Sequence, residues 1–345
     1  MKNDVLQKIK KTMKYFLFFS LFIIFIISSF IIYVISHELY TVQSMVASLY
    51  YSGYGVSQNY TKAAYWYQKA ADRDDSDAQS ALGYMYDTGK GVTKNSDKAV
   101  YWYRKAAEQN NPLALYNLGN LYFNGERVSQ NKADAARWYR KAADRGVAKA
   151  QYYLGYMYQS GEGVALNLVE AMRWYRKAAE QGLADAQYNL GSIYQAGEGV
   201  AKNNAEAMRW YLKAAEQKCP EAQNSLGNMY FNGEGVTQNR SEAARWFKKA
   251  AELGFASAQY NLGDMYYSGE GIPQNKKEAA LWYRKAAENG DADAQSMLGY
   301  MFENGDGVHQ DDSESARWYS KAAQQHETTD QSQIKDSDNN EGEGE

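Results

Sequence analysis

The sequence predicts an all-α solenoid, and two observations carry this prediction: the even spacing of tryptophan and the helical pattern inside each interval. The chain holds eight tryptophans, and each lies 36 residues after the one before it: Trp66, Trp102, Trp138, Trp174, Trp210, Trp246, Trp282 and Trp318. Self-similarity at a constant period of this length is the sequence signature of a repeat array. We therefore expect eight helix-turn-helix repeats of 36 residues each.

Both halves of the repeat show the pattern of an amphipathic helix of about three turns. In the first half, residues 186–200, the apolar positions are Ala186, Leu190, Ile193 and Tyr194, which share one face of an α-helix. In the second half, residues 170–180, they are Ala171, Trp174, Tyr175, Ala178 and Ala179. A single pair could not bury these faces, so the repeats are expected to stack on one another.

Glycine, asparagine and proline mark the ends of these helices. Gly161 and Gly163 follow a first helix, where glycine supplies the positive φ that turns require. In six repeats an Asn or Asp precedes an acid by three residues, which is the pattern of an N-cap. These pairs are Asn131 and Asp134, Asn167 and Glu170, Asn203 and Glu206, Asn239 and Glu242, Asn275 and Glu278, and Asp311 and Glu314. Glycines also follow four second helices (Gly146, Gly182, Gly254 and Gly290), and Pro112 and Pro220 begin first helices.

Seven glycines lie in the middle of first helices: Gly83, Gly119, Gly155, Gly191, Gly227, Gly263 and Gly299. A glycine inside a helix costs about 1 kcal/mol relative to alanine. Its recurrence implies a compensating close approach of a neighbouring helix. Ala70 and Ala106 in the second helices are expected to be small for the same reason, with Trp and Tyr filling the space between pairs.

These residues resemble the Sel1-like repeat family, which is related to the tetratricopeptide repeats. In one repeat the family pattern runs through Ala186, Leu190, Gly191, Tyr194, Gly197, Gly199, Val200, Ala207, Trp210, Tyr211, Lys213, Ala214 and Ala215. The resemblance covers residues 41–323, with Ala47, Arg127 and Phe302 as departures from the pattern. It implies a right-handed superhelix and a scaffold or adaptor, of a kind that bacteria often export.

An apolar segment precedes the repeats. None of the 22 residues 15–36 is charged, and a helix of this length reaches roughly 33 Å, enough to cross a bilayer core. Lysines precede it at Lys2, Lys8, Lys10, Lys11 and Lys14. The positive-inside rule then places residues 1–14 in the cytoplasm and the repeats on the other side of the membrane. The sequence thus predicts a transmembrane signal anchor at residues 15–36.

A cleaved secretory signal peptide is the alternative for this segment. Its apolar core is usually 7–15 residues long, and a cleavage site with small residues follows it. Here the apolar run is longer, and Ser36, His37 and Glu38 come next. We favour the uncleaved anchor, and in both cases the repeats leave the cytoplasm.

Charge separates the same segments. Residues 1–40 carry a net charge of +3 and residues 324–345 a net charge of −6, so the repeats are close to neutral within a total of −3. A nucleic-acid-binding surface would show a strong basic excess, so we expect no nucleic-acid partner. The acidic tail has too few apolar residues to bury and is expected to be disordered.

The free face of the first helices is the candidate binding surface. In the second repeat Leu82 and Tyr86 face the core, and a helical wheel places Ser80, Tyr84 and Thr88 opposite them. The likeness to tetratricopeptide repeats implies that this face lines a concave groove. The candidate protein-binding residues are Tyr84, Tyr116, Asn120, Asn124, Tyr152, Tyr156, Tyr188, Asn224, Asn228, Asn232, Tyr260 and Asp264. Tyrosine offers contact area at low entropic cost and asparagine offers donors and acceptors, whereas a merely soluble surface shaped by repeat duplication remains the alternative.

Other motifs give no support for catalysis or for a cofactor. The Gly-Glu-Gly-Val loops lack the further residues of a dinucleotide or P-loop motif, and the three histidines pair with no nucleophile. Cys219 is the only cysteine, which excludes an intramolecular disulfide and a zinc site built on several thiolates. A lysine column is interpreted as a solvated convex face: Lys69, Lys105, Lys141, Lys177, Lys213, Lys249, Lys285 and Lys321. No cofactor, no metal and no catalytic residue are expected.

The sequence therefore predicts a non-enzymatic scaffold, anchored in the membrane, that binds a protein or peptide in its concave groove. An exported factor that engages host or neighbouring-cell proteins is the second hypothesis, and an envelope enzyme is the third. The last helix, from Ser313, has no ninth repeat to cover it. Trp318, Tyr319 and Ala322 are accordingly expected to be exposed and to form a second contact site or a dimer interface.

Overall fold

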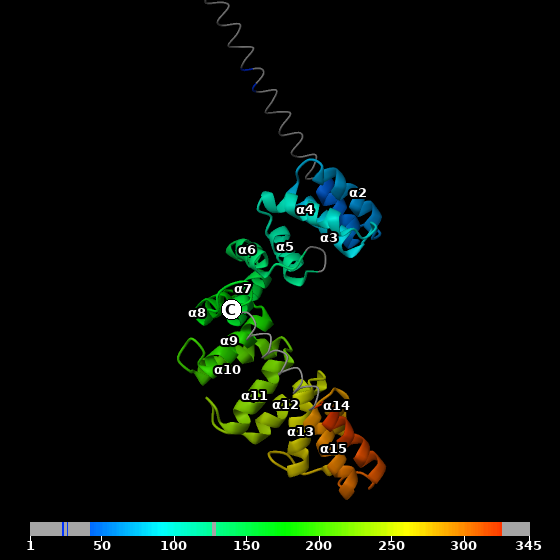
Figure 1. Ribbon diagram of the computed structural model, residues 1–345, viewed down its shortest axis with the longest axis vertical. Coiled ribbons are helices and arrows are strands. Elements are labelled where there is room, and N and C mark those ends of the chain that lie inside the picture. Colours follow the sequence, from blue (N-terminus) through cyan, green and yellow to red (C-terminus); the bar gives the residue numbers. More distant parts are fainter. Residues whose placement is uncertain (1–22, 24–25, 27–41, 126–128, 326–345) are drawn as a thin grey trace, which may run out of the picture. The chain divides into compact units, whose positions relative to one another are not determined.

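The computed structural model describes residues 23, 26, 42–125 and 129–325. Across residues 42–125 and 129–325 the backbone forms sixteen helices and no strand, which confirms the predicted all-α repeat fold (Figure 1). The first helix spans residues 42–52 and the last spans residues 312–325. Between them lie α2 (Tyr60–Ala71), α3 (Ser76–Thr88), α4 (Ser96–Glu108), α5 (Pro112–Asn124), α6 (Lys132–Asp144), α7 (Ala148–Ser160), α8 (Leu168–Glu180), α9 (Ala184–Ala196), α10 (Asn204–Glu216), α11 (Pro220–Asn232), α12 (Arg240–Glu252), α13 (Ala256–Ser268), α14 (Lys276–Glu288) and α15 (Ala292–Asn304).

The predicted segments outside the repeats lie largely outside the residues that the structure describes. The basic segment 1–14, all of the apolar segment 15–36 except residues 23 and 26, and residues 326–345 of the acidic tail lie outside the described residues. Among the helices that the structure does describe, none combines the length and apolar character needed to span a bilayer. The signal anchor and the disordered tail therefore stay predictions, as does the handedness of the superhelix.

The helices form two units, Met1–Ala150 and Gln151–Glu345. In each unit an odd-numbered helix is the first helix of a repeat, and the even-numbered helix after it is the second. Within the first unit α3 packs against α2 and α4, and α5 packs against α4 and α6. Within the second unit α9 packs against α8 and α10, and the same neighbour pattern continues through α15. Each first helix is thus covered on two sides, as stacking requires.

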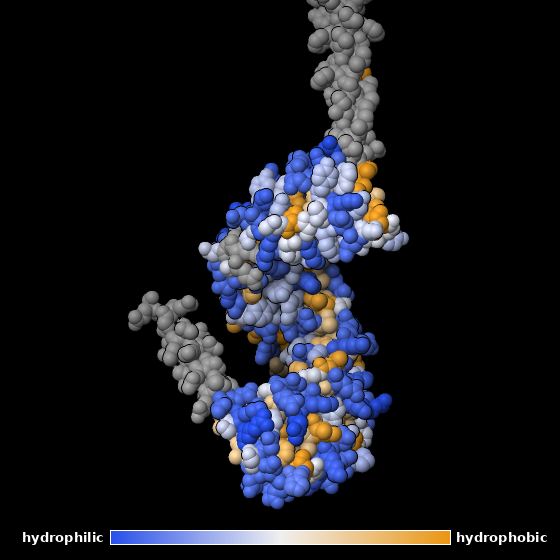
Figure 2. Space-filling view, turned by 90° about the vertical axis from the view of Figure 1, so that its right-hand side faces the viewer, coloured by the Kyte–Doolittle hydropathy of each residue, from blue (hydrophilic) through white to orange (hydrophobic). Residues whose placement is uncertain are grey.

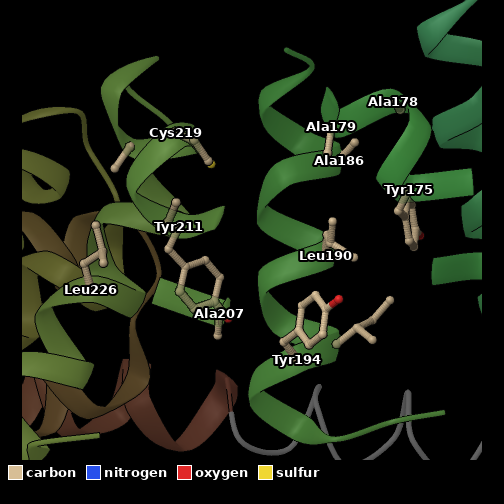
Figure 3. Packing of buried hydrophobic residues seen from close by; sticks show 14 of the residues in the cluster. Tyr175, Ala178, Ala179, Ala186, Leu190, Tyr194, Ala207, Tyr211, Cys219 and Leu226 are labelled. Atoms are coloured by element: carbon tan, nitrogen blue, oxygen red, sulfur yellow. The ribbon is translucent and has the colours of Figure 1, made fainter. Parts of the chain in front are cut away.

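The core of the second unit shows how one first helix serves both neighbours. Ala186, Leu190 and Tyr194 project from α9 toward Tyr175 of α8 and the alanines beside it (Figure 3). On its other side α9 presents Gly191 to the ring of Tyr211 from α10. The helix therefore carries apolar side chains toward the preceding repeat and a bare backbone toward its own partner.

The predicted close approach at the mid-helix glycines is confirmed, and the group that approaches is an aromatic ring. A Cβ added at Gly191 would lie 2.7 Å from Cε1 of Tyr211, and one at Gly119 would lie 2.5 Å from Cδ1 of Tyr139. The rings in question are the most deeply buried aromatic side chains of the fold. Five of them are at most 1 % exposed: Tyr103, Tyr139, Tyr175, Tyr211 and Tyr283.

The predicted helix ends are also confirmed. Asn203 Oδ1 accepts from the backbone N–H of Glu206 at 3.0 Å, and the other predicted Asn caps make the same bond. The glycines after the second helices have φ between 87° and 90°. Three repeats hold that left-handed position with another residue: Asp74, Asn110 and Lys218, at φ of 63° to 64°.

In seven repeats the tryptophan lies closer to the surface than the aromatic residue that follows it, and the last repeat, with Trp318 and Tyr319, is the exception. Trp66, Trp138, Trp210 and Trp246 are only partly buried, whereas the aromatic residue after each of them is buried. Each ring has its outer face free for the lysine three residues later. From Lys141 to Lys321 the ammonium nitrogen lies 3.8–4.6 Å from the ring centroid of that tryptophan. A cation over an aromatic face at an exposed site contributes about 0.5–1 kcal/mol, so the lysine column has a packing role on the solvated face.

The last helix differs from its prediction. Trp318 is 3 % exposed and Ala322 is 4 % exposed, whereas Tyr319 is 38 % exposed. Trp318 packs back into the cluster formed by α14 and α15, so it needs no ninth repeat to bury it. The expected exposure of Trp318 and Ala322 is therefore wrong. Self-association through this helix stays a prediction that rests on Tyr319 alone.

Candidate functional site

The first unit contains a cavity of about 700 Å³ on the predicted concave side. First helices supply most of its wall, because successive first helices present equivalent positions in a row. The lining residues are Tyr51, Tyr67, Asp77, Ser80, Ala81, Tyr84, Leu113, Tyr116, Asn117, Val147, Ala148 and Lys149. Tyr84 and Tyr116 belong to the predicted site, and the structure brings them together here.

The wall of this cavity is mostly aromatic and aliphatic, with a cation at its edge. The Lys90 ammonium lies 5.4 Å from the ring centroid of Tyr84 and 5.8 Å from that of Tyr51. Electrostatic interaction with the Tyr51 hydroxyl is the main cause that raises the pKa of Lys90, and hydrogen bonding to Tyr84 is the second. Lys90 therefore stays charged. Asp77 is engaged by the side-chain amide of Asn111, whose Nδ2 donates to its Oδ1 at 2.7 Å. The cavity thus offers apolar surface with a few polar groups around it, which is the usual make-up of a recognition pocket.

The second unit contains a smaller cavity of about 200 Å³ with a different lining. The residues around it are Asn228, Phe231, Phe247, Asn261, Asp264, Met265, Ser268 and Glu270. Asn228 and Asp264 belong to the predicted site. Burial raises the pKa of the Asp264 carboxyl, and the charges of Asp291 and Asp293 add to this effect.

Four predicted tyrosines are less open than the helical wheel suggests. Tyr116, Tyr152, Tyr188 and Tyr260 are half-buried. Each ring lies 5.7–6.0 Å, between centroids, from the buried tyrosine of the second helix of its repeat. Because the second-helix ring lies against the mid-helix glycine of the first helix, it also contacts these tyrosines of the same first helix. All four therefore take part in the packing, and Tyr116 also lines the cavity of the first unit.

The remaining predicted residues fall into two groups. Asn120 and Asp264 accept hydrogen bonds from the hydroxyls of Tyr139 and Tyr283, and Asn224 accepts from Asn261 at 3.1 Å. Tyr84 and Tyr156 are 38 % and 37 % exposed, and Asn124, Asn228 and Asn232 are exposed as well. The exposed residues supply the open surface, whereas the hydrogen-bonded residues connect that surface to the side chains packed beneath it.

Ser80 is a correction to the wheel, and Leu113 is a residue that the wheel missed. Ser80 is 5 % exposed, because its short side chain is covered by the larger residues that line the cavity with it. Leu113 lines the same cavity and is 61 % exposed. The sequence carried a signal for it. The other repeats have polar residues at this position: Asp77, Lys149, Asp185, Glu221, Ser257 and Asp293.

In the part of the chain that the structure describes, no group of three or more His, Cys, Asp or Glu residues is placed to hold a metal ion. Cys219 is buried at the start of α11, and burial raises the pKa of its thiol to about 12. A thiol with such a pKa stays protonated and is a poor nucleophile.

Comparison with known proteins relates these repeats to a protein family. The sequence profile of the Sel1 repeat matches eight consecutive segments: residues 42–75, 76–111, 112–147, 148–183, 184–219, 220–255, 256–291 and 292–326. No curated protein is significantly similar to the chain.

Two solved structures are similar in both sequence and fold. A protective antigen present in uropathogenic Escherichia coli strains, which displays an SLR fold, is 36 % identical with a TM-score of 0.76. The alignment covers 83 % of this chain and 62 % of the antigen, so the chain spans less than two thirds of that protein's length. A Sel1 repeat protein from Oxalobacter formigenes is 34 % identical with a TM-score of 0.66, and 80 % of each chain is covered. From the eight matched segments and these likenesses, the chain belongs to the Sel1 repeat family.

Proposed function

We propose that the chain is a non-enzymatic scaffold that binds a segment of a partner protein in the concave cavity of its first unit. Sel1 repeat proteins are protein-interaction scaffolds, and this chain carries eight such repeats. The observation that carries the proposal is the 700 Å³ cavity with exposed Leu113 and Tyr84 in its wall. An exposed apolar residue inside a concave, aromatic-lined cavity is typical of a surface that a partner covers.

The wall of the cavity indicates the chemistry of the partner. Leu113, Val147 and two alanines offer aliphatic surface, and the tyrosine rings offer flat faces with polar edges. A bulky apolar side chain on a flexible or extended segment would bury the most surface there. Asn117 provides an amide group able to bond to a peptide backbone.

Location outside the cytoplasm is the second part of the proposal. Residues 15–36 would anchor the chain in the membrane, with the lysines before them on the cytoplasmic side. The alternative is an exported factor released by signal cleavage, and the likeness to the uropathogenic Escherichia coli protein, which is described as a protective antigen, is an argument for it. The mass of the mature N-terminus separates the two: the anchor requires residues 15–36 to be retained.

The test uses substitutions that the repeat pattern itself tolerates. Leu113→Asp introduces the residue that other repeats have at this position, Asp77, Asp185 and Asp293. An acid in the first turn also favours the helix. Leu281→Asp is the matched control, because Leu281 is 53 % exposed on α14 and lies outside the cavity.

We expect full-length protein in mild detergent to retain a partner from an extract of its own cells. Leu113→Asp and Tyr84→Ala should each weaken that partner's binding at least about tenfold, since burying one large apolar side chain contributes roughly 1.5–3 kcal/mol. Leu281→Asp should leave the affinity unchanged. Equal affinity for all variants would place the binding surface elsewhere, and the absence of any retained protein would count against the scaffold function itself.

A further inference from the structure

The cavity of the second unit has a lining suited to one long polar side chain. It lies between α11 and α13, and its volume of about 200 Å³ is far smaller than that of the cavity in the first unit. Two phenylalanines and several polar groups share its wall. The groups that matter for binding are Asn228, Phe231, Phe247, Asn261, Asp264 and Glu270.

The carboxylate of Asp264 has hydrogen-bond donors but no counterion. Tyr283 donates its hydroxyl to Asp264 Oδ1, and within the described residues no Lys, Arg or His pairs with Asp264. The nearby ionisable groups on the packed elements are Tyr260, Tyr283, Asp291 and Asp293, none of which is a cation. A partly desolvated carboxylate among other acids is stabilised most by a positive charge brought next to it.

The rim of the same cavity already shows how a cation is held. The guanidinium of Arg240 lies 5.4 Å from the ring centroid of Phe231, and its Nε lies 3.6 Å from Glu270 Oε2. The inner wall adds the carboxylate of Asp264, and the partly buried ring of Phe231 lines the same cavity. Asn261 adds a side-chain oxygen, since its Nδ2 is already used in the bond to Asn224. A ring, a carboxylate and an amide oxygen are the groups that a planar guanidinium binds best.

We propose that this cavity binds a basic side chain of the partner protein, arginine in preference to lysine. The inference rests on the proposed scaffold function and adds the chemistry of a second contact. The Asp264 carboxylate distinguishes its repeat from the other repeats of the chain. At the position of Asp264 the other repeats have Ser48, Tyr84, Asn120, Tyr156, Ser192, Asn228 and Tyr300, so the carboxylate occurs here alone.

The repeat pattern supplies a variant that removes the charge and keeps the fold. Asn120 stands in the same position as Asp264 and accepts the hydroxyl of Tyr139 at 2.8 Å, as Asp264 accepts that of Tyr283. Asp264→Asn should therefore keep the hydrogen bond and the packing around it. Asp185→Asn is the control for the same chemical change, because Asp185 is exposed on α9 and outside the cavity.

The experiment measures binding of short peptides to the full-length protein by fluorescence anisotropy. The probes are labelled, amidated five-residue peptides, Ala-Leu-Xaa-Leu-Ala, in which Xaa is arginine, lysine, citrulline or glutamate. Citrulline keeps the shape of arginine and removes its charge. We expect the arginine peptide to bind at least about tenfold more tightly than the citrulline peptide, a difference of about 1.4 kcal/mol. Asp264→Asn should abolish that difference, and Asp185→Asn should preserve it.

Three results would overturn the inference: equal binding of the arginine and citrulline peptides, an unchanged preference in Asp264→Asn, or no binding by the parent up to about 1 mM peptide. These results are separate from a failure of the scaffold function. If the natural partner is lost with Leu113→Asp and kept with Asp264→Asn, the groove of the first unit stands and the basic-side-chain site falls. If both substitutions weaken the partner, both proposals hold.

Discussion

In seven of the eight repeats a glycine and an aromatic ring form a very close contact. The glycine lies in the first helix and the ring belongs to the second, and a Cβ at Gly227 would lie 2.5 Å from Cδ1 and Cε1 of Phe247. Helix propensity argues against glycine by about 1 kcal/mol. The contact nevertheless prevails, because it lets a large ring lie flat on bare backbone and bury nearly all of its surface. Phe247 is 2 % exposed as a result.

This contact makes the effect of one substitution depend on another residue. In the natural chain, Gly227→Ala should lower the free energy of unfolding by up to about 2 kcal/mol, since overpacking costs typically 1–3 kcal/mol and the gain in helix propensity offsets part of it. In a Phe247→Ala background the ring is gone, and the same substitution should raise the free energy of unfolding by about 1 kcal/mol. Urea unfolding followed by tryptophan fluorescence measures both. An effect of the same sign in both backgrounds would show that the ring does not decide the cost.

The two helices of a repeat differ in the residues that begin and end them. Each second helix from α2 to α14 begins at an asparagine whose side chain accepts from the backbone three residues on. First helices such as α9, α11 and α13 end at a left-handed glycine and lack a side-chain cap at their start, whereas Asp75, Asn111 and Asp291 cap α3, α5 and α15. The caps hold exposed helix starts next to solvent, where water competes for the free N–H groups. The sequence could reveal both devices because they depend only on neighbours along the chain.

The cap of α10 gives a direct measure of this device. Asn203→Ala should lower the free energy of unfolding by about 1 kcal/mol, because the N–H of Glu206 loses its acceptor. Asn203→Asp should stay close to the natural chain, since aspartate caps about as well as asparagine. Lys202→Ala, one residue earlier and outside the cap, serves as the control. A loss for Asp as large as that for Ala would mean that the amide, rather than the accepting oxygen, holds the helix start.

At the scale of the whole chain, the repeats share one architecture but differ in the surface that they present. Contacts within each unit run between successive helices, as in other repeat arrays, so stability is built from neighbouring pairs. The groove positions vary from repeat to repeat while the core positions do not. The first unit consequently offers a large apolar cavity, whereas the second offers a small one around Asp264. Polar residues cover most of the face visible in Figure 2, where apolar residues gather only in small patches.

The position of the repeats relative to the membrane is a property of the whole chain and has its own test. A reporter that is active only in the cytoplasm should be inactive when fused after Tyr319 and active when fused before Met1, because the lysines ahead of residues 15–36 hold the N-terminus inside. A reporter active only outside the cytoplasm should give the reverse pattern. Cytoplasmic activity of the fusion after Tyr319 would contradict both the anchored and the exported form.

The sequence by itself determined the period, the two helices of each repeat, their caps and turns, and the glycine positions that permit close approach. These features depend on spacing and on neighbouring residues, which one chain shows directly. Only the tertiary structure decided which groove residues are open. A helical wheel treats a helix as isolated, so it could not show that Tyr139 and its counterparts reach across the glycines to meet Tyr116 and the tyrosines like it.

The tertiary structure likewise decided which side chains of the last helix are buried and what shape the cavities have. Trp318 is buried because its ring packs back onto the preceding pair, a direction that the spacing of apolar residues does not encode. The cavity around Leu113 and the setting of Asp264 arise from side chains that different helices bring together. The repeat pattern specifies that each helix has a free face. How much room that face leaves for a partner depends on the volumes of the residues packed beside and beneath it.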